Sequence, residues 1–183
     1  AAAIDRSLSR LGVDYIDLLL LHHTAPQDED AYRAMQDAVG DGRVRSIGLS
    51  NFYEDDIDRI MRFAAIAPAV VQNETHPYFQ ERTVQQHIAR HGSVLEAWYP
   101  LGGRGNTRIL FNDPAIAEIA QTHGRTPPQI LLRWHLQAGH IAIPGSSNND
   151  HIRENTAVFD FTLTSDQMLS IGNLDRGRRF STY

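Results

Sequence analysis

Five apolar, strand-like runs recur along this sequence, and each of them ends in polar or aromatic side chains. The runs are LLLLHH (18–23), SIGLSN (46–51), AVVQNE (69–74), VLEAWY (94–99) and IAIPGSS (141–147). Active sites of parallel β/α barrels are built at the carboxyl ends of the strands, so this pattern is typical of that α/β fold. A complete (β/α)8 TIM barrel has eight strands in about 250 residues. The 183 residues therefore predict an incomplete TIM barrel, with about five of eight β/α units, as the C-terminal part of a single domain over 1–183.

Amphipathic segments separate these runs. The first four runs begin about 25 residues apart, and nearly continuous apolar strands that alternate with helices favour a parallel sheet with right-handed crossovers. Helices are predicted at 1–12, 30–40, 54–64, 80–91, 114–123, 127–138 and 149–155. A last helix is predicted to follow Thr164, which has capping-box spacing to Gln167. The glycine-rich stretch 101–110 is predicted to be a loop that covers a site.

Composition excludes several classes of function. A formal charge of -5 and a pI near 6.0 give no basic face for nucleic acid or a membrane surface, so neither is expected as a partner. The N-terminal residues AAAIDRSLSR show no signal-peptide core, and we expect a cytoplasmic protein. There is no cysteine, and all 17 basic residues are arginine. Thiolate metal sites, a cysteine nucleophile and a lysine Schiff base are therefore excluded for these residues.

Polar side chains that follow the first three runs are candidates for binding or catalysis. His22 and His23 end the first run, where alternation directs one of them into the mouth of a barrel. Ser50, Asn51 and Gln72 end the next two runs. Their uncharged donors and acceptors suit an amide or a sugar, although each can equally serve as an ordinary hydrogen-bonding group at a strand end.

Later segments add weaker signals. Trp98 offers a flat face on which a planar heterocycle can stack, with core packing as an equal alternative. The turn PGSSNN (144–149) precedes a predicted helix and is a candidate anion or phosphate seat. The histidines on predicted helices and turns are interpreted as exposed or packing residues. None of them forms an HExxH motif or a comparable ligand cluster, so no metal site is predicted.

Taken together, these segments resemble the aldo-keto reductase family, in particular its bacterial, diketogluconate-reductase-like members. The resemblance runs in order across nearly the whole chain. It rests on RLGVDYIDLLLLHH, GRVRSIGLSNF, VVQNETHPYFQ, EAWYPLGG, GRTPPQILLRWHLQ and IPGSSNNDHIRENTAVFDFTLT. It implies a barrel of which the N-terminal third is absent from these residues. The missing part, or another chain, is then expected to cover the open edges of the sheet.

The same resemblance implies a set of site residues. His22 would orient the substrate carbonyl. The implied cofactor-binding residues are Ser50, Asn51 and Gln72 at the nicotinamide carboxamide, Trp98 at the nicotinamide ring, Leu101 and Gly102 at the pyrophosphate, and Ser146, Asn148, His151, Glu154 and Asn155 at the adenosine end. The implied cofactor is NADP(H). Gly145 and His151 replace the usual lysine and arginine beside the 2′-phosphate, which makes NAD(H) a plausible cofactor as well.

The implied reaction is reduction of an aldehyde or ketone, including sugar-derived ones, to an alcohol. In the family the proton donor is a tyrosine tuned by a lysine and an aspartate, and none of the three maps onto this sequence. The 183 residues are therefore expected to be inactive alone. The alternative is a catalytically dead nucleotide-binding or regulatory protein of the same fold, while a hydrolase or isomerase is disfavoured because there is no carboxylate cluster or nucleophile elbow.

Overall fold

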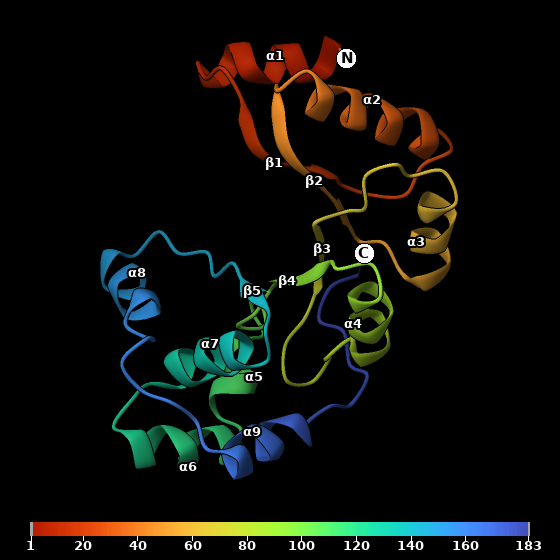
Figure 1. The fold of residues 1–183 in the computed structure, drawn as a ribbon. Helices are drawn as coiled ribbons and strands as arrows, with labels where there is room; N and C mark the ends of the chain where they lie inside the picture. Colours follow the sequence, from red (N-terminus) through yellow and green to blue (C-terminus); the bar gives the residue numbers. More distant parts are fainter. Residues whose placement is uncertain (1, 183) are drawn as a thin grey trace. The chain divides into compact units, whose positions relative to one another are not determined.

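Two compact units make up the chain in the computed structural model, which describes residues 2–182. Unit 1 comprises Ala1–Asn73 and Arg82–Leu95, and unit 2 comprises Glu74–Glu81 and Glu96–Tyr183. The strands β1 (Ile16–Leu21), β2 (Val44–Ser50), β3 (Val70–Glu74), β4 (Val94–Trp98) and β5 (Ile141–Ala142) form a parallel sheet in this order (Figure 1). Strands β3 and β4 each contribute residues to both units. The predicted α/β class is confirmed, and five parallel strands are consistent with an incomplete TIM barrel.

Unit 1 carries the first strand–helix repeats. Its elements are α1 (Ala2–Leu11), β1 (Ile16–Leu21), α2 (Asp28–Gly40), β2 (Val44–Ser50), α3 (Glu54–Met61) and α4 (Arg82–Ala89), together with parts of β3 and β4. Helix α2 packs against β1 and β2. Side chains of the helices and strands, including Met35, Leu49 and Ile57, bury one apolar cluster. Gly48 lets β2 approach β3, because a Cβ there would lie 2.5 Å from the Val70 carbonyl oxygen.

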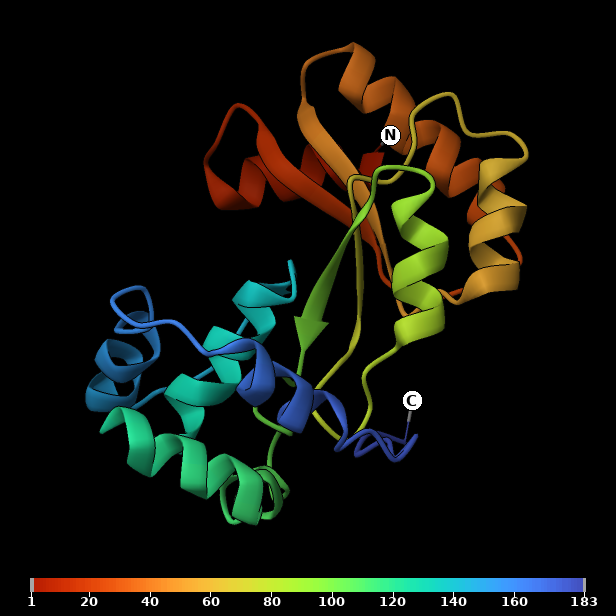
Figure 2. The same cartoon turned by 60° about the horizontal axis from the view of Figure 1, so that its bottom comes forward.

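Unit 2 combines the ends of β3 and β4 with β5 (Ile141–Ala142) and most of the C-terminal helices. The helices are α5 (Thr107–Phe111), α6 (Pro114–His123), α7 (Pro127–Gln137), α8 (Asn149–Thr156) and α9 (Ser165–Gly172). Strand β5 pairs with β4 through the register Glu96 to Ile141. Helix α6 contacts both α7 and α9 (Figure 2), and apolar side chains of these three helices form a second core that includes Ile119, Trp134 and Ile171.

Local signals explain why these helices begin and end where they do. The Asp113 side chain accepts the Ala115 N–H at 3.0 Å, and the left-handed Gly124 (φ 58°) ends α6. The predicted capping box of α9 is confirmed, since Thr164 Oγ1 accepts the Gln167 N–H at 3.2 Å. In the described part of the chain, no helix combines the length and apolar character needed to cross a bilayer.

One sequence prediction about an element was wrong in extent. The predicted loop 101–110 instead runs into the short helix α5, which begins at Thr107. The fifth strand covers Ile141–Ala142 and ends just before the predicted turn at 144–149. Ile143 still donates its N–H to the Ala97 carbonyl at 3.2 Å, but Pro144 has no N–H with which to continue the ladder.

Candidate functional site

Asn51 draws together all the predicted site residues of unit 1. Its Nδ2 donates to the His22 carbonyl at 3.2 Å and to Ser50 Oγ at 3.1 Å. Its backbone N–H donates to the Gln72 carbonyl at 3.0 Å. The carboxyl ends of β1, β2 and β3 are thus tied together by one side chain and its own backbone. We call His22, Ser50, Asn51 and Gln72 the strand-end cluster.

The conformation of Asn51 is unusual for a residue with a side chain. Its φ of 59° lies in the left-handed region, where a non-glycine residue costs free energy unless its surroundings hold it there. Its Oδ1 is buried and has no hydrogen-bond partner among the described residues. Because a buried acceptor without a donor is costly, this oxygen is suited to receive a donor from a bound molecule.

Aromatic and imidazole rings lie at two further strand ends. The His22 and His23 side chains are both exposed, and their rings meet edge to face at 4.3 Å between centroids. In unit 2, the half-buried Trp98 ring lies 4.5 Å from the Tyr99 ring. Tyr99 is also left-handed, with φ 57°, and a Cβ on Gly103 would lie 2.5 Å from its ring. The strand-end turn in unit 2 therefore depends on a glycine to accommodate an aromatic side chain.

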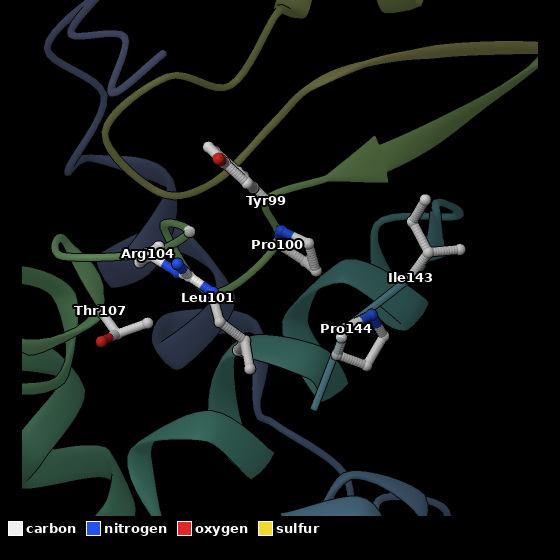
Figure 3. Close-up of a pocket in the computed structure, with 9 residues that line it drawn as sticks. Tyr99, Pro100, Leu101, Arg104, Thr107, Ile143 and Pro144 are labelled. Carbon is white, nitrogen blue, oxygen red and sulfur yellow. The ribbon is translucent and has the colours of Figure 1, made fainter. Parts of the chain in front are cut away.

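A pocket of about 360 Å³ opens in unit 2 beside this turn. Figure 3 shows that its walls come from the segment 99–107 after β4 and the segment 143–145 after β5. Leu101 and Pro144 give it apolar walls, while Arg104 and Thr107 supply a cation and a hydroxyl. Such a mixture of apolar walls and a few polar groups is typical of small-molecule sites.

A second pocket of unit 2, about 210 Å³, brings together most of the residues predicted for the adenosine end of a dinucleotide. The predicted residues that line it are Leu101, Ser146, His151, Glu154 and Asn155, and Gly145 lies among them. Leu101, Thr107 and Gly145 line both pockets, so the two are neighbours. The residues that line the two pockets come from segments that are distant in the sequence, so the fold, and not one contiguous motif, assembles this surface.

Two predicted residues play local structural parts instead of lining either of these pockets, as far as the described residues show. The Asn148 Oδ1 caps α8 by accepting the Asp150 N–H at 2.8 Å, so the helix N-terminus is already partly satisfied. Gly102 is buried, with φ 87°, and a Cβ there would lie 3.0 Å from Leu110 and 3.2 Å from Phe180. The predicted binding roles of Asn148 and Gly102 stay predictions.

Sequence reasoning missed several lining residues. Thr107 and Phe111 belong to α5, which was not predicted, and Pro128 lies in the first turn of α7. Arg104 lies in the glycine-rich stretch that was predicted to cover a site, but it was not singled out. For Pro128 the sequence did contain a signal, because this residue belongs to the motif GRTPPQ (124–129) on which the family resemblance rests.

Two tyrosines are committed to internal acceptors. The Tyr32 hydroxyl donates to the Ile66 carbonyl at 2.9 Å, and burial raises the pKa of Tyr32 well above its ordinary value. The Tyr78 hydroxyl donates to Asp113 Oδ2 at 2.6 Å, and burial together with this carboxylate raises the pKa of Tyr78. A tyrosine acting as an acid at neutral pH needs the opposite shift, so neither side chain is suited to proton donation.

Comparison with known proteins finds relatives along nearly the whole chain. A sequence model of the aldo/keto reductase family matches residues 1–176. The chain is 41% identical over 190 residues to a morphine 6-dehydrogenase of Pseudomonas putida and 42% identical over 184 residues to a 2,5-diketo-D-gluconic acid reductase B of a Corynebacterium. Each match covers 97% of this chain but only 64% and 65% of the relative, so the chain spans less than two thirds of their length.

A solved structure gives the same result for the fold. The aldo-keto reductase of Bombyx mori, in complex with NADP, matches 98% of this chain and 64% of its own, with a TM-score of 0.89 and 33% sequence identity. The predicted resemblance is therefore confirmed by sequence and by structure. The chain belongs to the aldo/keto reductase family.

Proposed function

We propose that the protein carrying these residues reduces small aldehydes and ketones, including sugar-derived ones, with a reduced nicotinamide dinucleotide. The relatives act on compounds of this kind by name, among them 2,5-diketo-D-gluconic acid. When bound, the dinucleotide supplies the hydride that the carbonyl carbon accepts. Within this reaction the strand-end cluster holds the nicotinamide carboxamide, and the 210 Å³ pocket holds the adenosine end.

The single observation that carries the proposal is the buried Oδ1 of Asn51. A carboxamide presents an NH2 group, which is a donor of the kind that this oxygen lacks among the described residues. The other groups of Asn51 are held by His22, Ser50 and Gln72, so the oxygen is fixed in place before any ligand arrives. The residues present therefore fit a nicotinamide carboxamide. We propose that His22, at the neighbouring strand end, orients the substrate carbonyl.

The 183 residues are expected to hold the dinucleotide and to orient the substrate carbonyl, but not to supply the proton that completes the reduction. They contain no lysine, and Tyr32 and Tyr78 are tied to internal acceptors. A positioned general acid contributes roughly 10² to 10⁴ in rate. The 183-residue polypeptide is thus expected to bind the dinucleotide without appreciable turnover. The same observations favour a second function, a nucleotide-binding or regulatory protein that keeps the cofactor residues and lacks the chemistry.

A measurement of carbonyl-dependent NADPH oxidation distinguishes the carbonyl reductase from the nucleotide-binding or regulatory protein. The 183-residue polypeptide of 20.6 kDa is mixed with NADPH and 2,5-diketo-D-gluconate, and dinucleotide oxidation is followed by absorbance. We expect binding without carbonyl-dependent oxidation. If the protein also shows no oxidation when expressed with any sequence that precedes Ala1 in its gene, the regulatory function holds. Oxidation by the 183 residues alone would contradict the assignment of the proton donor to other residues.

Replacing Asn51 by glycine tests the proposed nicotinamide contact. Glycine tolerates φ 59° without strain, so the variant removes the amide and leaves the turn possible. Losing one hydrogen bond of about 1.4 kcal/mol weakens NADPH binding by about tenfold. Binding of the fragment 2′,5′-ADP, which lacks nicotinamide, stays unchanged. Asn173→Gly, at the exposed C-cap of α9, serves as the matched control.

Equal weakening of NADPH and 2′,5′-ADP in Asn51→Gly would show that the substitution damages the fold and not the contact. Unchanged NADPH affinity would remove Asn51 from the site.

The choice between NADP(H) and NAD(H) is expected to be relaxed. Gly145 and His151 occupy the positions of two family cations, and both line the 210 Å³ pocket. Arg153 pairs with Asp150 at 3.0 Å, and both side chains are exposed, so Arg153 is the nearby cation that would have to leave this pair in order to compensate. An arginine or lysine beside a phosphate typically contributes ~1.5 to 3 kcal/mol, so its absence removes much of the usual preference.

Gly145→Lys tests this account of the preference. A Cβ on Gly145 meets no heavy atom within 4 Å, so a side chain can be added without a clash at its base. The variant is expected to bind NADPH about tenfold better relative to NADH than the parent does, in fluorescence titrations. Gly40→Lys adds the same charge at an equally open position of α2 and should change neither affinity. A hundredfold preference of the parent for NADPH would contradict the account.

A further inference from the structure

A cluster of metal-ligand side chains lies in unit 1, apart from every residue assigned above. It consists of Asp58 on α3, His87 in the last turn of α4 and His91 in the turn that follows α4. Helices α3 and α4 pack against each other, which places the three side chains on adjacent elements. We call these three residues the Asp-His-His cluster.

The ligand atoms of this cluster are close enough for one ion. His87 Nε2 and Asp58 Oδ1 are 2.8 Å apart, and one ligand atom from each of the three residues lies within 4.8 Å of the others. Zinc binds imidazole nitrogen and carboxylate oxygen at about 2.0–2.2 Å, so ligands on one ion lie roughly 3.3 Å apart. Small side-chain rotations are enough to reach this spacing. Asp58 is exposed and both histidines are half-buried, which leaves room for such rotations.

The chemistry of the cluster selects a borderline transition metal. Two imidazoles and one carboxylate suit Zn²⁺, Ni²⁺, Co²⁺ or Cu²⁺ better than Mg²⁺ or Ca²⁺, which prefer sites made of oxygen ligands only. The i and i+4 spacing of His87 and His91 brings their rings to 5.8 Å between centroids. Three protein ligands leave a fourth position for water.

Charges of both signs lie around the cluster, since Arg62 follows α3 and Arg90 lies between His87 and His91. Helix α3 carries four carboxylates, Glu54, Asp55, Asp56 and Asp58, and a single arginine. That arginine, Arg59, is engaged elsewhere, since it bonds Asp28 at 3.0 Å and Asp56 at 2.9 Å.

We propose that the Asp-His-His cluster is a binding site for Zn²⁺ or a similar divalent transition metal. Binding replaces the hydrogen bond between His87 and Asp58 with two metal bonds, and the proton of His87 Nε2 moves to Nδ1, so that a neutral imidazole binds the ion. The ion joins α3 to the end of α4 and thereby stabilises unit 1. The site contains none of the residues assigned to the cofactor or to the carbonyl, so the ion is not expected to take part in carbonyl reduction.

This proposal departs from the prediction, made from the sequence, that there is no metal site. That prediction examined the histidines for ligand motifs along the chain. Asp58 precedes His87 by 29 residues, so the cluster becomes visible only when the packing of α3 against α4 is known.

Isothermal titration of the tag-free protein with ZnCl2 tests the proposal. We expect one site, and affinity weakened by about tenfold or more in His91→Gln and in Asp58→Asn. His123→Gln removes a partly buried histidine of unit 2 and serves as the matched control, with no change expected at this site. Equal Zn²⁺ binding in the parent and in both cluster variants, or no Zn²⁺ binding by the parent, would overturn the proposal.

A measurement on the parent protein alone keeps the test decisive if a variant fails to fold. Hydrogen exchange with and without Zn²⁺ should show slower exchange for amides of α3 and α4, and no change in α6 or α9. Slower exchange confined to other helices would place the ion elsewhere and refute the site.

Discussion

Units 1 and 2 share a parallel strand architecture but are stabilised by different interactions. Unit 1 buries a single apolar cluster, and among the described residues Asp28 is the one buried carboxylate or histidine in it. Unit 2 divides its apolar residues between two smaller clusters. It also buries six carboxylates and histidines, namely Glu74, His76, Glu96, Asp113, His135 and His140. Burying an ionisable group is costly unless it has a partner, and its protonation then changes the free energy of unfolding. The stability of unit 2 is therefore expected to depend on pH far more than that of unit 1.

The clearest example is the pair His135 and His140. Their Nδ1 atoms are 3.2 Å apart, and His135 Nε2 lies 3.3 Å from the Pro100 carbonyl oxygen. This geometry allows Nε2–H of His135 to donate to Pro100 while its Nδ1 accepts from His140. His135 must then be neutral, because one of its ring nitrogens donates and the other accepts. Burial lowers the pKa of His135 well below its ordinary value, and burial lowers that of His140 to about 4.

The largest expected effect is therefore a loss of unit 2 stability in mild acid. Below its ordinary pKa of 6.5 each histidine takes up a proton in the unfolded chain but not in the folded one. Stability contributed by the pair is full above pH 6.5 and falls as the pH drops toward 4. For His140 alone the loss is on the order of 3 kcal/mol. Hydrogen exchange measured at pH 7 and pH 5 should show α7 opening at the lower pH, with α2 and β2 of unit 1 much less affected. If the amides of α2 and β2 exchanged faster at pH 5 while those of α7 did not, the proposed difference between the two units would be wrong.

A substitution in the apolar cluster of unit 1 should behave in the opposite way. Leu49 is fully buried, and Leu49→Ala is expected to lower the free energy of unfolding by about 3 kcal/mol, by the same amount at pH 7 and pH 5. Urea unfolding at the two pH values measures both numbers. Leu169→Ala, at an exposed position of α9, is the control and should cost less than about 0.5 kcal/mol. A strong pH dependence of the Leu49→Ala effect would contradict a purely apolar origin.

The smallest effect concerns Glu74, which holds the C-terminal segment of unit 2. It accepts backbone N–H groups of Phe180 at 2.5 Å and Ser181 at 3.1 Å, and its Oε1 lies 3.2 Å from His76 Nε2. Burial alone would raise its pKa, but the hydrogen bonds from His76, Phe180 and Ser181 outweigh burial and lower it. The stabilising contribution of this carboxylate is therefore present above its ordinary pKa of 4.5 and lost as the pH falls further.

Glu74→Gln keeps the shape of the side chain but removes the charge. We expect a loss of about 2 kcal/mol at pH 7, which vanishes at pH values low enough to protonate Glu74 in the parent. Urea unfolding across this pH range is the measurement. Increased exchange should be confined to the amides of 178–182. A loss that is constant with pH would show that the contacts of Glu74 do not depend on its charge.

Much of the fold was predictable because its signals are local. Helix α6 was predicted at 114–123 and confirmed there, since Asp113, Pro114 and Gly124 mark its two ends within the sequence itself. Helix α5 was missed because its five residues are too few for periodicity and follow the glycines of GGRGN. The end of the fifth strand was predictable, because Pro144 begins the predicted turn and has no N–H with which to continue the pairing.

The site was predictable only in part, for a physical reason. Residue types at strand ends can be read from the sequence, and the resemblance supplied roles for them. The left-handed backbone of Asn51 and its bonds to three strands arise from packing between segments that are distant in the chain. The partnership of His135 with His140 and that of Asp58 with His87 likewise depend on the orientation of side chains in the folded chain.

The most direct test of the proposed function is to observe where a dinucleotide binds. The 15N-labelled protein is titrated with NADPH, and chemical shifts of backbone and side-chain amides are followed. We predict the largest shifts at the Asn51 side-chain amide and at the amides of Ser146, His151 and Glu154. The absence of binding, or shifts confined to residues outside the strand-end cluster and the 210 Å³ pocket, would contradict the account.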